Sequence, residues 1–410
     1  MEREAILVAI DVGTSKVVTL IGEVTRDGAV TIIGKGAPAS SGLKKGVVIN
    51  IDQTVNSIRS AREQAERLSG YRLESAIVGV GGSHVESQNS RGAVAVSGPR
   101  REVSSEDIER ATEVARAVTI PSNREVLHVI PRGYVVDGQE GVKDPLGMSA
   151  VRLEVETHIV HASATAVQNL TKCVQRADIK IDELVAGSLA SGDAVLSETE
   201  RELGVAVADF GAGTLDLALF LDGSPFHTAV LPLGGNNVTN DVAIGLKTSL
   251  TAAEELKIIH GTADPTTVAE DQQVEVETIG EGGRTASRLE LAQIIEARMR
   301  EVFEKIGEEI GRAGSQGKLP AGLVLTGGAS ELAGTAQLGR EVLQMPVRVA
   351  GPTGVGGLTD HLLTPAFSTS LGLLLWGARS VRGYEPLRYE SAAAPGMMSR
   401  MRDWLRGLAP

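Results

Sequence analysis

Val-Ala-Val-Ala-Asp-Phe-Gly-Ala-Gly-Thr-Leu-Asp-Leu-Ala-Leu-Phe-Leu, from Val205 to Leu221, is the stretch that indicates the fold most strongly. An apolar run reaches Asp209, a glycine-containing turn follows, and a second apolar run alternates with Asp216. This pattern predicts a strand, a tight turn and a second strand. A carboxylate at the end of a buried strand needs a partner, and glycines let backbone amides approach an anion. The stretch therefore predicts a metal–phosphate site, with a plain hairpin and an Asp-capped turn as the alternative.

The same pattern occurs near the start of the chain, in residues 5–20. Asp11 corresponds to Asp209 and Gly13 to Gly211, and each pair lies between apolar runs. The two stretches are about 200 residues apart, which is too far for a solenoid repeat. We infer two related domains whose turns face each other across a cleft.

A third stretch, residues 322–330, ends an apolar run in the pair Gly327 and Gly328 before a helical segment. The order of the three motifs resembles the two phosphate hairpins and the adenosine motif of the actin, sugar-kinase and chaperone ATPase superfamily. Within it, essentially the whole chain resembles the FtsA family of bacterial cell-division proteins. The resemblance implies an α/β, actin-like (ribonuclease-H-like) two-domain fold with an inserted small α+β subdomain.

Composition limits the possible classes of protein. With 410 residues the chain is long enough for two domains, and its net charge of −12 argues against a nucleic-acid partner. The single cysteine, Cys173, excludes an intramolecular disulfide, and its apolar surroundings indicate packing. No apolar stretch approaches the roughly 20 residues of a membrane span. Four histidines are scattered without metal-ligand spacing: His84, His128, His158 and His161.

Pattern and resemblance together divide the chain into segments. We expect a first domain at 1–83 and 164–196, an inserted subdomain at 84–163, a second domain at 197–378 with a partner-binding subdomain at about 233–310, a linker at 379–396 and an amphipathic helix at 397–410. Local patterns predict helices at 53–68, 164–177, 185–196, 287–310 and 367–376, and strands at 77–82, 92–96, 125–136, 151–160 and 274–279. Capping boxes are predicted at Ser104–Asp107 and at Thr251–Glu254.

The resemblance implies that ATP and Mg²⁺ bind between the two hairpins. Asp11 and Asp209 would hold the metal, Asp11 through water, and Lys16 would place a point charge on phosphate unless it is an ordinary solvated lysine. Glu254 and Lys257 would contact ribose and adenine, or Glu254 would only cap its helix. The glycine pair before the helix near Gly235 would lie near phosphates, or would only begin that helix. The implied nucleotide site comprises Asp11, Gly13, Thr14, Ser15, Lys16, Asp209, Gly211, Ala212, Gly213, Thr214, Gly235, Glu254, Lys257, Gly327 and Gly328.

The segment 185–196 bears on hydrolysis. In many superfamily members this segment supplies a carboxylate or glutamine that orients the attacking water. Here glycine or serine takes that place, and Asp193 lies more than one turn later. Because phosphoryl transfer depends on a residue that orients the nucleophile, we expect ATP hydrolysis to be slow or absent.

The resemblance also implies protein partners. The sequence Ile-Ile-Glu-Ala-Arg, ending at Arg298, resembles the family's contact helix for the C-terminal tail of the tubulin-like protein FtsZ. Arg298 would anchor an acidic group of that tail, with a solvated surface arginine as the alternative. The inserted subdomain would contact other protomers of a filament and later division proteins, or would be an elaboration without a role of its own.

The C-terminal segment has the pattern of a helix lying in a membrane interface. One helical face would carry Met397, Met401, Trp404, Leu405 and Leu408, opposite mostly charged residues. A single copy would bind an anionic membrane weakly, whereas a filament presenting many copies would bind firmly. The alternative is a terminal helix packed on its own domain.

These expectations describe an ATP-binding division protein that polymerises and tethers the FtsZ ring to the cytoplasmic face of the cell membrane at the division site. An actin-like pilus-assembly scaffold is a close alternative. A small-molecule kinase on the same fold is another, although the sequence offers no convincing general base beside an acceptor. A chaperone ATPase would need a peptide-binding domain after the second domain.

Overall fold

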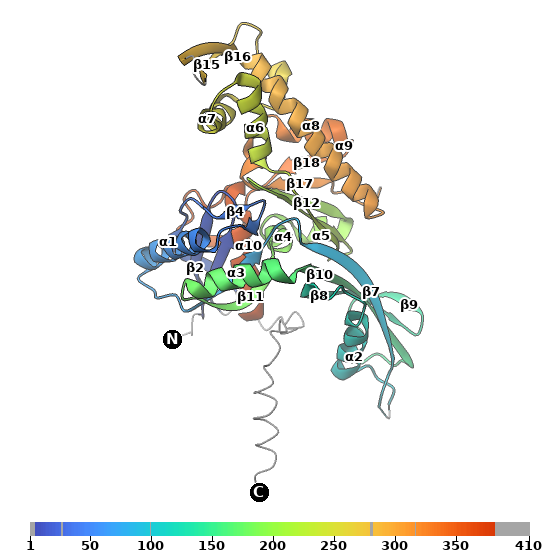
Figure 1. Cartoon of the computed structure of the whole chain (residues 1–410). Helices are drawn as coiled ribbons and strands as arrows, with labels where there is room; N and C mark the ends of the chain where they lie inside the picture. Colours follow the sequence, from blue (N-terminus) through green and yellow to red (C-terminus); the bar gives the residue numbers. More distant parts are fainter. Residues whose placement is uncertain (1–4, 26–27, 99, 279–281, 316, 382–410) are drawn as a thin grey trace.

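The computed structural model describes residues 5–25, 28–98, 100–278, 282–315 and 317–381 (Figure 1). The first large sheet has the strand order β11-β6-β1-β2-β3-β19. Its strands are β1 (Ala5–Val12), β2 (Val17–Val24), β3 (Val30–Gly36), β6 (Ser75–Val80), β11 (Lys180–Ala186) and β19 (Val355–Gly357). A short hairpin, β4 (Leu43–Lys44) and β5 (Val47–Val48), precedes the first helix. The sheet mixes antiparallel hairpin pairs with parallel crossovers, as an α/β fold requires.

Helices cover both faces of this sheet. On one face lie α1 (Ile51–Ser69) and α3 (Ala164–Arg176), whose buried side chains join one aliphatic core with β1 and β6. On the other face, α10 (Ser368–Val381) packs Leu371, Leu373 and Leu374 against β1 and β2. The short helix α4 (Gly187–Val195) lies against α10, and a Cβ on Gly372 would come 1.8 Å from the Ala190 carbonyl oxygen. Only glycine permits the two helices to cross this closely.

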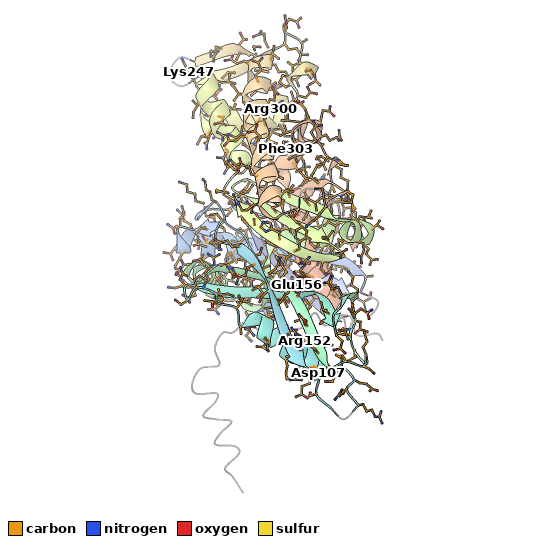
Figure 2. The ribbon with its side chains drawn as sticks, turned by 90° about the vertical axis from the view of Figure 1, so that its right-hand side faces the viewer. Asp107, Arg152, Glu156, Lys247, Arg300 and Phe303 are labelled. Atoms are coloured by element: carbon orange, nitrogen blue, oxygen red, sulfur yellow. The ribbon has the colours of Figure 1, made fainter. Side chains whose placement is uncertain are left out.

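The second large sheet has the order β14-β13-β12-β17-β18. Its strands are β12 (Val205–Phe210), β13 (Leu215–Leu221), β14 (Ser224–Leu231), β17 (Leu323–Thr326) and β18 (Val347–Val349). Its helical elements are α5 (Glu198–Leu203), α6 (Gly235–Leu246), α7 (Leu250–His260), η1 (Pro265–Thr267), α8 (Arg288–Arg312), η2 (Gly328–Glu331), α9 (Thr335–Leu343) and η3 (Pro365–Phe367). A two-stranded ribbon, β15 (Gln273–Thr278) and β16 (Gly282–Ser287), lies above them (Figure 1). The long helix α8 buries one apolar side, including Phe303, while Arg300 lies on the same helix (Figure 2).

The inserted part is a separate four-stranded sheet with the order β7-β10-β8-β9. Its elements are β7 (Glu86–Ala95), α2 (Ser105–Arg116), β8 (Arg124–Val136), β9 (Gln139–Val142) and β10 (Arg152–Ser163). The predicted capping box is confirmed, because Ser104 and Asp107 bond reciprocally at the start of α2. These hydrogen bonds hold the pKa of Asp107 well below its usual range. Asp107, Arg152 and Glu156 all lie in this part of the molecule (Figure 2).

The inserted sheet is hydrogen-bonded to both large sheets. On the side of the second sheet, Ser87 Oγ donates to the Thr228 carbonyl and accepts from the Thr228 amide, each at 2.8 Å. His158 contacts the same residue, with Nε2 2.9 Å from Thr228 Oγ1. On the side of the first sheet, His128 Nε2 accepts from the Ala186 amide at 3.0 Å. The inserted sheet is thus hydrogen-bonded to Thr228 of β14 and to Ala186, the residue just before α4.

Most predicted helices and strands are present, but one cap and several bounds differ. The second predicted capping box is wrong, because Ser249 rather than Thr251 caps α7 and accepts from the Ala252 amide at 3.2 Å. The strand predicted at 92–96 is too short, since β7 begins at Glu86. The segment 185–196 begins as the end of β11. Helix α10 continues through the first residues of the predicted linker, to Val381.

The remainder of the linker and the predicted membrane helix lie outside the described residues. Within the ranges that the structure covers, no helix is long and apolar enough to cross a membrane. Cys173 is buried, which agrees with a packing role.

Candidate functional site

The two motifs form equivalent hairpins at the ends of the two large sheets. Strand β1 pairs antiparallel with β2, and β12 with β13. In the first turn the Gly13 amide donates to the Lys16 carbonyl at 3.1 Å, and in the second the Gly211 amide donates to the Thr214 carbonyl at 2.9 Å. A Cβ on Gly13 would lie only 2.8 Å from the Lys16 carbonyl oxygen, so the first turn needs glycine. The prediction of two matching strand–turn–strand motifs is confirmed.

The two turns meet each other. Thr14 packs directly on Gly213, where an added Cβ would lie 2.6 Å from Thr14 Oγ1. The same hydroxyl accepts from the Gly46 amide at 3.2 Å. The Ser15 side chain points to solvent. We call the region formed by residues 11–16 and 209–216 the hairpin junction.

Three carboxylates converge on the hairpin junction. Burial, together with the charge of Asp209, raises the pKa of Asp11 to about 7. Burial raises the pKa of Asp209 to about 6, and burial with the neighbouring charge of Asp209 raises that of Asp216 to about 7. Because each negative charge opposes the others in a poorly solvated place, the cluster favours a cation.

Asp216 is the member of this cluster that the motif comparison missed. In the antiparallel register Asp216 lies directly opposite Asp209, and Thr214 Oγ1 donates to its Oδ2 at 3.0 Å. The sequence signal was the alternation of Asp216 with apolar residues at the start of β13, close to the turn. Within the described part of the chain, no cluster of three or more His, Cys, Asp or Glu side chains is arranged to hold a metal ion. A metal ion here would therefore need water or phosphate oxygens among its ligands.

Lys16 is not a solvated hairpin lysine. Its Nζ lies 3.6 Å from the centroid of the Phe367 ring, and Lys35 Nζ lies 4.7 Å from the same centroid. Burial lowers the pKa of Lys16, and the charges of Asp11 and Glu331 oppose that shift. The ammonium of Lys16 is a point charge that could meet an anion, provided that a cation compensates the neighbouring carboxylates Asp11 and Asp209. Phe367 carries no motif, so sequence reasoning did not find it.

The predicted residues of α6 and α7 lie together next to the second turn. The Gly235 amide donates to the Gly211 carbonyl at 2.9 Å, so this amide is engaged in holding the turn. Lys257 Nζ donates to the Gly235 carbonyl at 3.3 Å and to Glu254 Oε2 at 2.6 Å. Thr239 also donates to Glu254. Glu254 is therefore part of a network between α6 and α7 rather than a helix cap.

The third motif lies against Asp209. Gly327 has a φ of +82°, and a Cβ there would lie 2.4 Å from Asp209 Oδ1. Only glycine meets both conditions, because other residues rarely adopt this φ and the space is filled. The following Gly328 faces Ala366 of η3, 3.4 Å from where its Cβ would be. Gly327 thus lies against the hairpin junction, and the approach of adenosine to Gly327 and Gly328 stays a prediction.

The start of α4 also faces the hairpin junction. A Cβ on Gly187 would lie 3.7 Å from Asp216 Oδ1, and the buried Ser188 Oγ has no hydrogen-bond partner among the described residues. Asp193 is turned away and pairs with Arg201 and Arg379. The expectation of slow or absent hydrolysis considered only the residues of α4. In the structure, β13 brings a carboxylate, that of Asp216, next to the start of α4.

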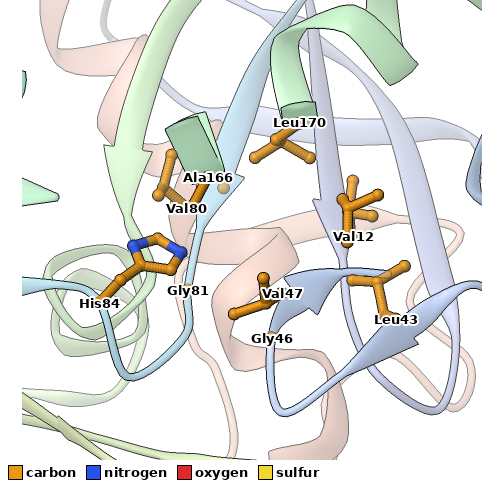
Figure 3. A pocket seen from close by; sticks show the side chains of 11 residues that line it. Val12, Leu43, Gly46, Val47, Val80, Gly81, His84, Ala166 and Leu170 are labelled. Atoms are coloured by element: carbon orange, nitrogen blue, oxygen red, sulfur yellow. The ribbon is translucent and has the colours of Figure 1, made fainter. Parts of the chain in front are cut away.

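A small pocket adjoins the first hairpin (Figure 3). It is lined by Val12, Leu43, Gly46, Val47, Val48, Gly79, Val80, Gly81, His84, Ala166 and Leu170. His84 supplies its one ionisable side chain, and burial lowers the pKa of that imidazole. The lining is otherwise aliphatic or glycine, so the pocket lacks the charged groups that would hold phosphate.

Arg298 lies far from the hairpin junction, on α8, and is already paired. Its guanidinium donates to both carboxylate oxygens of Asp241 on α6, with Nη2 3.1 Å from Oδ1, and it also bonds Glu301. Its side chain is 24% exposed, so it is neither fully solvated nor buried. An acidic partner group at Arg298 would have to compete with these two carboxylates.

Comparison with known proteins identifies the family. The model of the SHS2 domain inserted in FtsA matches residues 82–161, and the model of the cell division protein FtsA matches residues 206–372. Cell division protein FtsA of Pseudomonas aeruginosa is 43% identical, over 98% of this chain and 97% of the relative. The FtsA proteins of Bacillus subtilis and Escherichia coli K12 are 42% and 38% identical, over 93% and 98% of this chain and 86% and 97% of their own lengths.

Solved structures show the same fold at low sequence identity. The PilM–PilN type IV pilus biogenesis complex superposes with a TM-score of 0.66 and 18% identity, over 93% of this chain and 99% of that chain. MreB5 of Spiroplasma citri bound to ADP gives a TM-score of 0.56 and 11% identity, over 92% of this chain and 97% of that chain. These likenesses confirm the predicted actin-like α/β fold. The chain belongs to the FtsA family of cell-division proteins.

Proposed function

We propose that this protein is an ATP-binding division protein that polymerises on the membrane and links the FtsZ ring to it. The observation that carries the proposal is the hairpin junction, where two equivalent turns meet through Thr14 and Gly213. Three mutually repelling carboxylates and one desolvated lysine lie at this junction. This set of charges fits a magnesium nucleotide, because the metal compensates the carboxylates and the phosphates compensate the lysine.

We assign a group of residues to each part of the nucleotide. Asp11 and Asp209 would hold Mg²⁺ through water, and Lys16 with the two glycine turns would hold the phosphates. Glu254 and Lys257 would contact the ribose and adenine, with Gly327 and Gly328 near the adenosine as well. The likeness to the crystal structure of MreB5 of Spiroplasma citri bound to ADP is consistent with this arrangement. Bound Mg²⁺ would polarise the terminal phosphate, and the chain's own residues would orient and enclose it.

The other parts of the proposal concern partners and place. Family membership favours a division role over the pilus-scaffold and kinase alternatives. We propose that Arg298 on α8 binds the C-terminal tail of FtsZ and that the inserted sheet contacts neighbouring protomers and later division proteins. Residues 397–410 would anchor filaments to anionic lipid at the cytoplasmic face of the division site.

Calorimetric titration with ATP and Mg²⁺ tests the nucleotide site. Asp209→Ala and Lys16→Ala should each weaken ATP binding at least about 10-fold, because each loses a charge-assisted contact. Arg300→Ala is a matched control, since this arginine pairs with Glu296 and Glu341 on the surface of the second domain. Unchanged affinity in both hairpin variants would contradict the assignment of the nucleotide to the hairpin junction.

A further inference from the structure

Asp209 belongs to the second large sheet, but the hydroxyl that fixes its carboxylate belongs to a helix of the first. Thr369 Oγ1, in the first turn of α10, donates to Asp209 Oδ2. The rest of α10 packs on β1 and β2 through its leucines. The hydrogen bond therefore joins the two halves of the molecule at Asp209, which is proposed to hold Mg²⁺ through water.

The position of Thr369 is strongly constrained. Next to it, Ser368 Oγ lies 2.6 Å from Thr326 Oγ1, and Thr326 is the residue that pairs with Asp209 across β12 and β17. On the side of α4, the Thr369 methyl group lies 3.7 Å from where a Cβ on Gly187 would be. Further along α10, Gly372 crosses α4 closely at Ala190.

The Asp209 carboxylate is thus held on two sides. Gly327 lies against Oδ1, and the Thr369 hydroxyl donates a hydrogen bond to Oδ2. A buried carboxylate that is left without such a donor can rotate, and rotation would move its oxygens away from the orientation that they hold here.

We propose that Thr369 is a positioning residue that holds Asp209 in the orientation required for Mg²⁺ and so makes metal-assisted nucleotide binding depend on α10. The inference rests on the proposed nucleotide site. It predicts that the hydroxyl of Thr369 matters for the magnesium-dependent part of ATP affinity and not for the part that remains without magnesium.

The test is ATP affinity measured by calorimetry, once with saturating Mg²⁺ and once with chelator, on the full chain. The readout is the factor by which Mg²⁺ tightens ATP binding. Thr369→Val removes the hydroxyl at similar volume and should reduce this factor about 3- to 10-fold. Thr369→Ser restores the donor and should keep the factor within about 2-fold of wild type. Ser370→Ala is the control, because among the residues that the structure describes its hydroxyl bonds only the Phe367 carbonyl, at 3.0 Å.

Three results would overturn the inference. In the first, Thr369→Val keeps the full magnesium effect while Asp209→Ala loses it. In the second, Thr369→Val weakens ATP equally with and without Mg²⁺, which indicates a purely structural role. In the third, Thr369→Ser fails to rescue. Thr369→Ala supplies the same readout if valine crowds Gly187. A wild-type protein that does not bind ATP would instead refute the proposed function itself.

Discussion

Single residues at the hairpin junction divide into those that a motif reveals and those that only the fold brings there. Asp11 and Asp209 follow from a local pattern of strand, acid and glycine. Thr369 lies 160 residues from Asp209 in sequence, and its contact depends on how α10 crosses α4. Phe367 reaches Lys16 in the same way. Such long-range contacts leave no periodicity in the sequence.

The buried His158 should make the free energy of unfolding depend on pH. His158 is fully buried, with Nδ1 2.8 Å from Asn89 Oδ1, and burial lowers its pKa to about 3. In the unfolded chain the imidazole of His158 binds a proton below about pH 6.5. In the folded chain the same imidazole stays neutral until the pH approaches 3. The folded state therefore loses stability relative to the unfolded state as the pH falls from about 6.5 toward 3.

Chemical denaturation of wild type and His158→Gln measures this contribution. Between about pH 7.5 and about pH 5, the wild type should lose roughly 2 kcal/mol more free energy of unfolding than the variant. The raised pKa values of Asp11 and Asp216 act in the opposite direction in both proteins and cancel in the comparison. Parallel pH profiles for the two proteins would show that His158 is protonated in the folded state.

Elements with strong periodicity were predictable, and their ends were less so. Helices α1 and α8 follow from apolar spacing, because each buries one stripe against a sheet. The cap of α7 was misplaced because Ser249 offers the same hydroxyl two residues before Thr251. A tertiary contact with Thr239 and a local ion pair with Lys257 then hold Glu254 away from the helix start. Local capping rules cannot detect that competition.

Helix α8 also carries the partner prediction. Arg298→Glu should weaken binding of an FtsZ tail peptide at least about 10-fold, because it reverses the charge that would meet an acidic group. ATP affinity should not change, since the residue lies away from the hairpin junction. Arg300→Glu, two residues later on the same helix, is the matched control. Equal peptide affinity for Arg298→Glu and wild type by fluorescence anisotropy would remove Arg298 from the binding site.

At the scale of the whole molecule, the repeated motif was enough to predict two related domains. The inserted sheet was also expected, because the rhythm of strands and helices changes in that region. Its attachment was not predictable, since His128 bonds the Ala186 amide while Ser87 and His158 bond Thr228. These contacts depend on side chains that carry no shared pattern. They connect the inserted sheet to both large sheets.

Membrane attachment is a prediction about residues 397–410. Deletion of residues 397–410, or Trp404→Glu, should give a protein that still binds ATP but no longer sediments with anionic vesicles. Binding of the wild type should weaken at high salt, because part of the attraction is electrostatic. Should the truncated protein sediment with vesicles as completely as the full chain, the anchor would have to lie elsewhere.

The central claim is that a magnesium nucleotide binds where the two hairpins meet. A crystal structure with Mg²⁺ and a non-hydrolysable ATP analogue tests it most directly. We predict that the phosphates contact the amides of turns 13–16 and 211–214, with Mg²⁺ linked through water to Asp11 and Asp209. Phosphates bound elsewhere, with the two aspartates still contacting only protein, would contradict the account.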